Sequence, residues 1–192
     1  MSGNHRVAGV VACVAAGACA LSFSSVASAA TTANPTVTGT VAGGALSVAT
    51  SAAPTFSANL ALGDSTPTYT LPLTATDTTG TGAGWNLTIT STQFTTGGAT
   101  PHTLLTNAST ITGVPAPPCA SGTCTAPTNA VTYPVVVPAG ATAPTAVKFF
   151  NAAAATGMGS FTVTPTVGVF VPALTFAGSY SSTLTVSIVS GP

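Results

Sequence analysis

The stretch "DTTGTGAGWNLTIT", residues 77–90, joins a glycine-rich run to the single tryptophan of the chain. From Trp85 onward apolar and polar residues alternate, so that Trp85, Leu87 and Ile89 share one face. A period of two is typical of a strand that buries one side and leaves the other in water. This stretch therefore predicts a turn followed by a half-buried β-strand.

Two hypotheses explain Trp85. The large ring either binds a partner of the domain or fills the domain's own hydrophobic core. Its phase with Leu87 and Ile89 favours the core, since residues on one face of a strand are buried together. The glycines at 82 and 84 are then expected to let the backbone pass close to the ring, where a Cβ would clash.

Similar strand patterns recur along the chain, with turns rich in Gly, Pro, Asn and Thr between them. Proline inside two of them, at Pro134 and Pro165, indicates edge strands or bulges. Only residues 151–159 suggest a helix, and a short one. We expect an all-β domain, an antiparallel β-sandwich or a Greek-key barrel. The further expected strands are residues 45–49, 56–62, 68–75, 131–137, 146–150, 161–169 and 180–188.

Residues 1–30 have the features of a secretory signal peptide. His5 and Arg6 precede an apolar run from Val7 to Leu21, and small residues follow up to Ala30. We expect cleavage after Ala29 or Ala30. The run is too short for a good membrane span, and the last expected strand leaves no room for a lipid-anchor signal. A single domain of residues 31–192 remains.

Charged residues are almost absent from this predicted mature chain. It keeps only Lys148 against Asp64 and Asp77, a formal charge of −1. Nucleic acid is excluded as a partner, because phosphate binding requires several Lys or Arg on one face. Attraction to anionic lipid is excluded for the same reason.

Two cysteines, Cys119 and Cys124, remain after signal removal. In an exported chain their spacing predicts a disulfide that closes a tight loop. A metal site is the weaker alternative, because no second cysteine pair exists and His102 is the only mature histidine. We expect no metal and no cofactor.

The same scarcity leaves little for catalysis. Asp64 and Asp77 both lie beside turn residues, where an Asx side chain commonly bonds its own backbone. No serine lies in a nucleophile motif, and no set of acid, base and nucleophile can be assembled. We therefore expect no enzyme activity and no catalytic residue.

Two segments resemble the signatures of the WxL domain family, a cell-surface module of Gram-positive bacteria. In "TDTTGTGAGWNLTIT" the positions of an Asp, a glycine-rich run and Gly-Trp-x-Leu are filled by Asp77, Gly84, Trp85 and Leu87 among others. The C-terminal "YSSTLTVSIVSGP" is similar to the second signature. Tyr180, Leu184, Ile188 and Pro192 are in register there.

The resemblance extends over nearly all of the mature chain, through "GGALSV" near its start and "GMGSFTVTPTVGVFVPA" before the last strand. Two positions depart from the family pattern: Val186 stands where the family has its second tryptophan, and Thr79 where members often have arginine. These departures bear on affinity for the wall more than on the fold.

The resemblance implies an exported protein at the cell surface that binds the peptidoglycan cell wall without a covalent link. It assigns binding to Trp85, Leu87, Asp77 and Tyr180. Partners are then a wall polymer, together with other surface proteins or further copies of the chain. A second hypothesis is a structural subunit that assembles with itself into a surface layer or fibre, because strands with open edges and a neutral, Thr-rich surface favour association.

Overall fold

A computed structural model describes residues 36–192 and places Thr40–Pro192 in one compact unit. The predicted signal peptide, residues 1–30, lies outside the described residues. Twelve strands and one short 3₁₀ helix make up the described part. The strands are β1 (Leu46–Ala49), β2 (Thr68–Thr70), β3 (Leu73–Asp77), β4 (Trp85–Thr92), β5 (Ser109–Gly113), β6 (Cys119–Ser121), β7 (Val135–Val136), β8 (Ala139–Gly140), β9 (Val147–Ala152), β10 (Gly159–Val163), β11 (Thr166–Val169) and β12 (Leu184–Ser190); the helix is η1 (Leu60–Leu62).

The first layer is built on one long antiparallel ladder. β3 pairs with β10, and β2 continues the same direction by pairing with β11. The backbone N–H of Leu71 donates to the carbonyl of Pro165 at 3.1 Å, which bridges the gap between the two halves. β1 lies on the outer side of β3, while β6 and β5 lie beyond β10 and β11.

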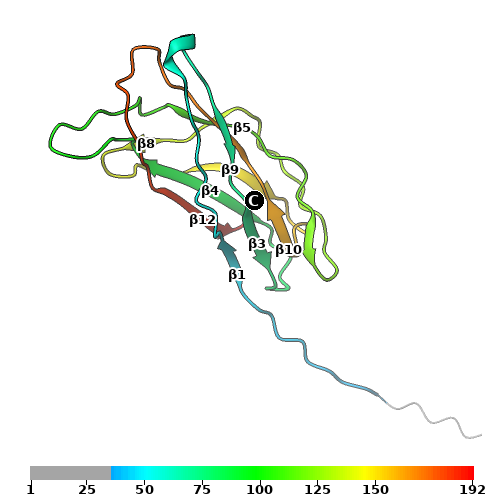
Figure 1. The fold of residues 1–192 in the computed structure, drawn as a ribbon. Coiled ribbons are helices and arrows are strands. Elements are labelled where there is room, and N and C mark those ends of the chain that lie inside the picture. The colour runs from blue at the N-terminus through cyan, green and yellow to red at the C-terminus, as the bar shows by residue number, and fades with distance from the viewer. Residues whose placement is uncertain (1–35) are drawn as a thin grey trace, which may run out of the picture. The chain divides into compact units, whose positions relative to one another are not determined.

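The second layer is centred on β4. β12 pairs with β4 over its whole length, from Leu184 opposite Ser91 to Ser190 opposite Trp85. On the other edge of β4, β9 pairs antiparallel and β8 pairs parallel. Figure 1 shows β1, β3 and β10 side by side in one layer and β12, β4 and β9 in the other.

Both layers contribute to one hydrophobic core, which confirms the predicted all-β sandwich. Every second residue of β3 and of the first part of β4 is buried, as the alternation predicted. Burial of a large aliphatic or aromatic side chain contributes about 2 kcal/mol. The largest fully buried side chains are Trp85, Phe149, Phe150, Phe161, Leu73, Leu87, Ile89, Ile111, Val137, Val163, Val167 and Val169.

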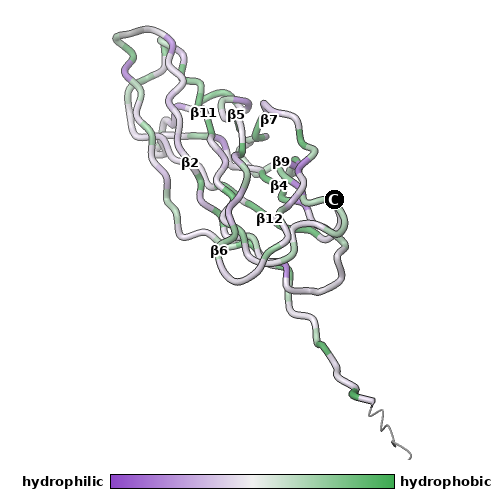
Figure 2. Tube along the Cα trace, turned by 90° about the vertical axis from the view of Figure 1, so that its right-hand side faces the viewer, coloured by the Kyte–Doolittle hydropathy of each residue, from purple (hydrophilic) through white to green (hydrophobic). Residues whose placement is uncertain are grey.

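Residues with hydroxyl groups occupy most exposed positions of the strands. Thr74 of β3 and Thr185 and Ser187 of β12 are exposed, in phase opposite to their buried or half-buried neighbours. Pale tones prevail along the tube in Figure 2, because Thr, Ser and Gly are neither strongly hydrophilic nor hydrophobic. The hydroxyl groups therefore keep the surface hydrated, although it carries few ionised groups.

Several expected elements differ from the structure. Residues 56–62 form no strand; they run as a loop into η1, where the side chain of Asn59 caps the amide of Ala61. Alternation fails there because the segment has no partner strand. Residues 151–159 form no helix, because Asn151 and Ala152 end β9 and a turn follows.

The two prolines fit the two predicted alternatives, an edge strand at Pro134 and a bulge-like register shift beside Pro165. Pro134, after a cis peptide bond from Tyr133, precedes the short strand β7, which among the described strands pairs only with β5 and is an edge strand as predicted. Pro165 does not lie in an edge strand, since β10 and β11 have partners on both sides. It lies between two strands instead, where no ladder donor is needed, and a register shift follows between Thr166 and Val167.

Trp85 occupies the core and crosses between the layers. Its side chain is 0% exposed, and its ring lies 5.8 Å from that of Phe150. The indole Nε1–H donates to the carbonyl of Gly157 at 2.8 Å. Gly157 lies in the connection from β9 of the second layer to β10 of the first layer. The bond therefore links β4, the central strand of the second layer, to the loop that joins the two layers. The expected core role is confirmed.

The glycines that serve the ring are not the ones expected. At Gly82 an added Cβ would meet only the Cα of Ala155, at 3.9 Å. At Gly84 it would strike the backbone of Ala152 and Ala153, not the ring. Gly157 lies against the indole and Ala152: a Cβ there would strike the Cβ of Ala152 and lie 2.7 Å from Nε1 of Trp85, and φ is +71°. The ring therefore requires glycine on the partner loop and not in its own turn.

We predict that Gly157→Ala lowers the free energy of unfolding by about 3 kcal/mol, because overpacking adds to the cost of a positive φ. Gly80→Ala is the control, since φ is +70° and an added Cβ has open space. It should cost about 1 kcal/mol. Chemical denaturation measures both, and equal losses would show that neither the indole nor Ala152 constrains position 157.

Candidate functional site

Asp77 and Thr79 organise the turn that joins β3 to β4. Asp77 is 4% exposed, and its Oδ1 accepts hydrogen bonds from the N–H of Thr79 at 3.0 Å and the hydroxyl of Thr79 at 2.7 Å. This is the turn role expected for this carboxylate. Thr79, at the position where family members often have arginine, thus acts as the partner of Asp77.

The signature segments meet at one end of the sandwich. Gly44 N–H donates to the carbonyl of Thr78 at 2.7 Å, and Ala155 N–H donates to that of Gly82 at 2.8 Å. The chain terminus joins them through Gly191, whose N–H donates to the carbonyl of Gly84 at 3.0 Å. We name these contacts the signature end. Its hydrogen bonds are backbone bonds between connections, so its evident role is to close the sandwich.

Trp85 and Leu87 are wholly buried, and Asp77 nearly so. None of these three presents a side-chain surface to a partner. Their assignment to binding stays a prediction, and any part they have in it is indirect. Tyr180, the fourth predicted residue, is half-buried and lies elsewhere.

Tyr180 borders a large groove, which we name the lateral groove. One wall is the segment 48–61, and the other is the segment 175–186, which includes Val186 in the place of the family's second tryptophan. The floor is formed by Tyr69, Leu71, Leu73, Phe94 and Leu104. Its volume is about 1390 Å³. In Figure 1 the walls are the cyan segment after β1 and the red segment leading into β12.

The lateral groove exists because two edge strands do not pair. Among the described residues β1 pairs only with β3, and β12 pairs only with β4. β1 ends at Ala49, and the chain then runs without a partner strand as far as η1. The side of the sandwich beside Leu184 and Val186 is therefore left without a covering strand.

The lining of the lateral groove combines aromatic rings with hydroxyl groups. No Asp, Glu, Lys, Arg or His lines it. The ring of Phe56 packs edge-on against that of Phe94, with the ring centroids 5.4 Å apart. It stacks on the ring of Tyr69, with the centroids 6.4 Å apart. At the rim Phe176 is 63% exposed, and the hydroxyl of Tyr180 donates to its carbonyl at 2.9 Å.

Tyr69 contributes an unusual polar group. Its side chain is 8% exposed, yet within the described residues its hydroxyl has no hydrogen-bond partner. It is not sealed from solvent either, because no buried side-chain oxygen or nitrogen of the described residues lacks a partner. Burial raises the pKa of Tyr69 to about 12. The hydroxyl is thus neutral and accessible to solvent, and its residue lines the groove.

The sequence did not reveal Phe56, Tyr69, Phe94 and Phe176 as groove residues. Tyr69 appeared only as a core position of an alternating strand. The others lie outside the strands or just beyond β4, so no periodicity brings them together. The available signal was a run of Ser and Thr interrupted by single rings, as in residues 174–183.

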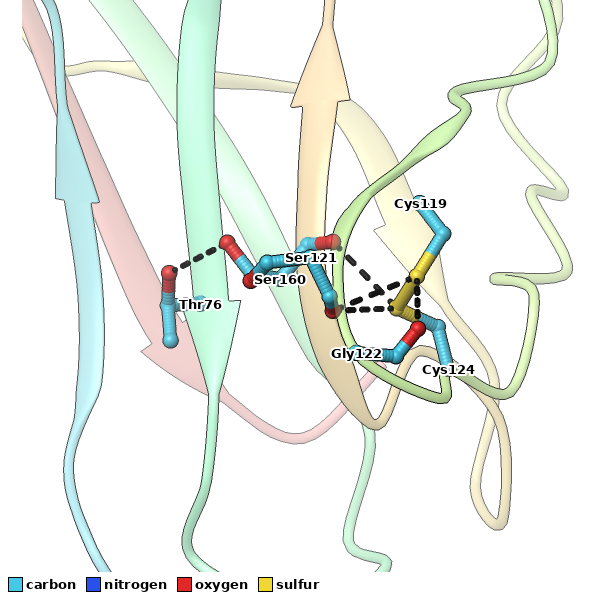
Figure 3. The surroundings of a disulfide bond; sticks show 6 residues. All are labelled: Thr76, Cys119, Ser121, Gly122, Cys124 and Ser160. Carbon is cyan, nitrogen blue, oxygen red and sulfur yellow. Dashed lines mark hydrogen bonds between the residues drawn. A yellow bond between two sulfur atoms is a disulfide. The ribbon is translucent and has the colours of Figure 1, made fainter.

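The predicted disulfide between Cys119 and Cys124 is present, with the Cα atoms 5.9 Å apart. Figure 3 shows it at the side of β10, where the carbonyls of Ser121 and Ser160 lie beside the sulfur atoms. Neither cysteine lines the lateral groove. The bond holds the loop after β6 against the edge of the first layer.

The remaining polar candidates do not form a cluster. Oδ1 of Asp64 accepts from the N–H of Ala173 at 2.8 Å, so this carboxylate ties two distant loops instead of capping its own turn. His102 stacks on Phe176 with the ring centroids 3.8 Å apart. In residues 36–192 no three His, Cys, Asp or Glu side chains lie close enough together to hold a metal ion.

Comparison with known protein families identifies the class. The model of the family described as "WxL domain surface cell wall-binding" matches residues 42–192. The chain therefore belongs to the WxL family of surface cell wall-binding domains, as its two signatures indicated. Neither the curated proteins nor the solved structures contain a match. No helix in the described part of the chain has the length and apolarity needed to cross a membrane.

We predict that stability falls as the pH rises above 10. Tyr69 ionises near pH 10 when unfolded but near 12 when folded, so the unfolded chain loses its proton first. Tyr69 does not lower the free energy of unfolding below pH 10. Between pH 10 and pH 12 its effect lowers that free energy progressively, by about 2 to 3 kcal/mol in all. Chemical denaturation at increasing pH measures the loss. Tyr69→Phe should reduce it, and an undiminished loss would place its cause elsewhere.

Proposed function

We propose that the protein is a secreted, non-catalytic surface protein that binds the peptidoglycan cell wall non-covalently. The observation that carries the proposal is the uncharged lateral groove beside Tyr180, in a domain that belongs to a wall-binding family. Export is supported by the signal-like pattern of residues 1–30. The signature end supports binding by holding the layers that form the groove.

The absence of catalysis is supported by what the polar groups already do. The carboxylate of Asp77 is buried in its own turn, that of Asp64 is bound to Ala173, and His102 is stacked on a ring. A hydrolase needs an acid, a base or a nucleophile in mutual reach, and these groups have separate structural partners. Binding is the activity that such a surface performs without them.

We predict that the processed chain co-sediments with purified, protein-free sacculi. Retention should change little between low and high salt, because almost no charges are present to be screened. Trp85→Ala should abolish retention through loss of the fold, which loss of the β-sheet signal in circular dichroism would register. Wild-type protein that stays in the supernatant at moderate salt would contradict the proposal.

Self-assembly remains a second candidate, favoured by an exposed alternating segment. In "TVTGTV", residues 36–41, Val37 is 91% exposed and Val41 is 100% exposed. Such a segment can pair as an added strand with the open edge of a sheet. The edge of β12 in a second copy of the chain is a candidate. Sedimentation velocity over a concentration series tests this: assembly predicts species that grow with concentration, whereas a monomer throughout excludes it.

A further inference from the structure

Charged ligands and purely apolar ligands both fit the lateral groove poorly. An ionised peptide or a phosphate-bearing polymer would lose its hydration there without gaining a counter-ion, because no charged side chain lines the groove. An acyl chain would leave the hydroxyls of the walls without hydrogen-bond partners. The groove suits a neutral ligand that has both apolar faces and hydroxyl edges.

We propose that the lateral groove binds the glycan strand of peptidoglycan, and not its peptide stems. This rests on the proposed function and names the wall component that the protein recognises. A pyranose ring has an apolar C–H face that packs on an aromatic ring, and a rim of hydroxyl and acetamido groups that exchange hydrogen bonds. N-acetylated sugars joined through glycosidic oxygens carry no charge along the strand.

The groove supplies both halves of this chemistry. Tyr180 and Phe176 stand at the rim, on the wall that leads into β12, and provide the ring of Tyr180 and the face of Phe176 that His102 does not cover. Ser57, Ser179 and Ser181 are exposed residues of the lining, so their hydroxyls are accessible to a ligand. These serines lie on the two facing walls, as a strand of sugars between them requires.

Tyr69 is the most specific element of the site. The Tyr69 side chain is 8% exposed and lines the groove, and its hydroxyl reaches solvent without a hydrogen-bond partner among the described residues. The floor therefore offers one fixed donor, beneath rings at the rim and serines on the walls, to a sugar hydroxyl or acetamido oxygen.

The test is competition for binding to sacculi by soluble probes. A neutral oligosaccharide of β-linked N-acetylglucosamine stands in for the glycan strand, and the controls are purified stem peptides and phosphatidylcholine vesicles. We expect the oligosaccharide to release the protein from sacculi, and the other two to leave it bound. Release by stem peptides or by vesicles, without release by the oligosaccharide, would overturn the inference.

Variants locate the site. Tyr69→Phe removes only the hydroxyl and should weaken oligosaccharide binding about three- to tenfold, the usual effect of one lost hydrogen bond. Phe176→Ala removes an exposed ring and should weaken binding about tenfold. Matched controls are Tyr133→Phe, which removes a hydroxyl bonded to the carbonyl of Phe149, and Phe170→Ala, and neither residue lines the groove. Both controls should bind as wild type.

The outcomes separate this inference from the proposed function. If wild-type protein binds sacculi but both groove variants bind them equally well, the wall-binding function stands and the groove is not its site. If wild type fails to bind sacculi, direct titration with the oligosaccharide by calorimetry decides the inference alone. Heat of binding that Tyr69→Phe diminishes supports the groove, and no heat with wild type refutes it.

Discussion

The fold depends on the indole of Trp85 and its bond to the carbonyl of Gly157. The ring fills the largest volume of the core, and its N–H is satisfied by the loop that carries the chain from one layer to the other. A buried indole without that acceptor would cost about 1 to 3 kcal/mol. The acceptor must approach closely, which requires glycine at 157, and the ring must begin a strand, which the turn from Asp77 arranges. In this chain the tryptophan of the first signature therefore joins the two sheets.

The signature end and the lateral groove have different roles. The signature end gathers backbone bonds from the start of the domain, the turn after β3, the loop after β9 and the chain terminus. The lateral groove, bordered by Tyr180 and Val186, is left open because β1 stops at Ala49. The backbone bonds of the signature end hold the two layers together. The lateral groove can therefore stay open without a change in strand register. The valine in place of the second tryptophan lies on the open side, where a smaller side chain leaves more room.

Period-two alternation predicted the strands with a buried face, because burial is what the pattern records. It identified β3, β4 and the core position of Trp85. It failed at residues 56–62, where apolar residues serve a groove wall instead of a sheet, and it missed β5 and β6, whose sequences around Ile111 and Cys119 alternate too little. The groove was beyond prediction, because Phe56, Tyr69 and Phe176 are joined only by the topology of the layers. The resemblance named signature residues, and the structure shows that three of the four are buried while one borders open space.

The most direct test of this account is the fluorescence of the protein, since Trp85 is its single tryptophan. An indole with 0% exposure, surrounded by Phe150 and aliphatic side chains, should emit at short wavelength and resist quenching by acrylamide in the native state. Both properties should change together, in one cooperative step, as denaturant separates the layers. Emission at the wavelength of a solvated indole, with free quenching in the native protein, would contradict the claim that this ring holds the two sheets together.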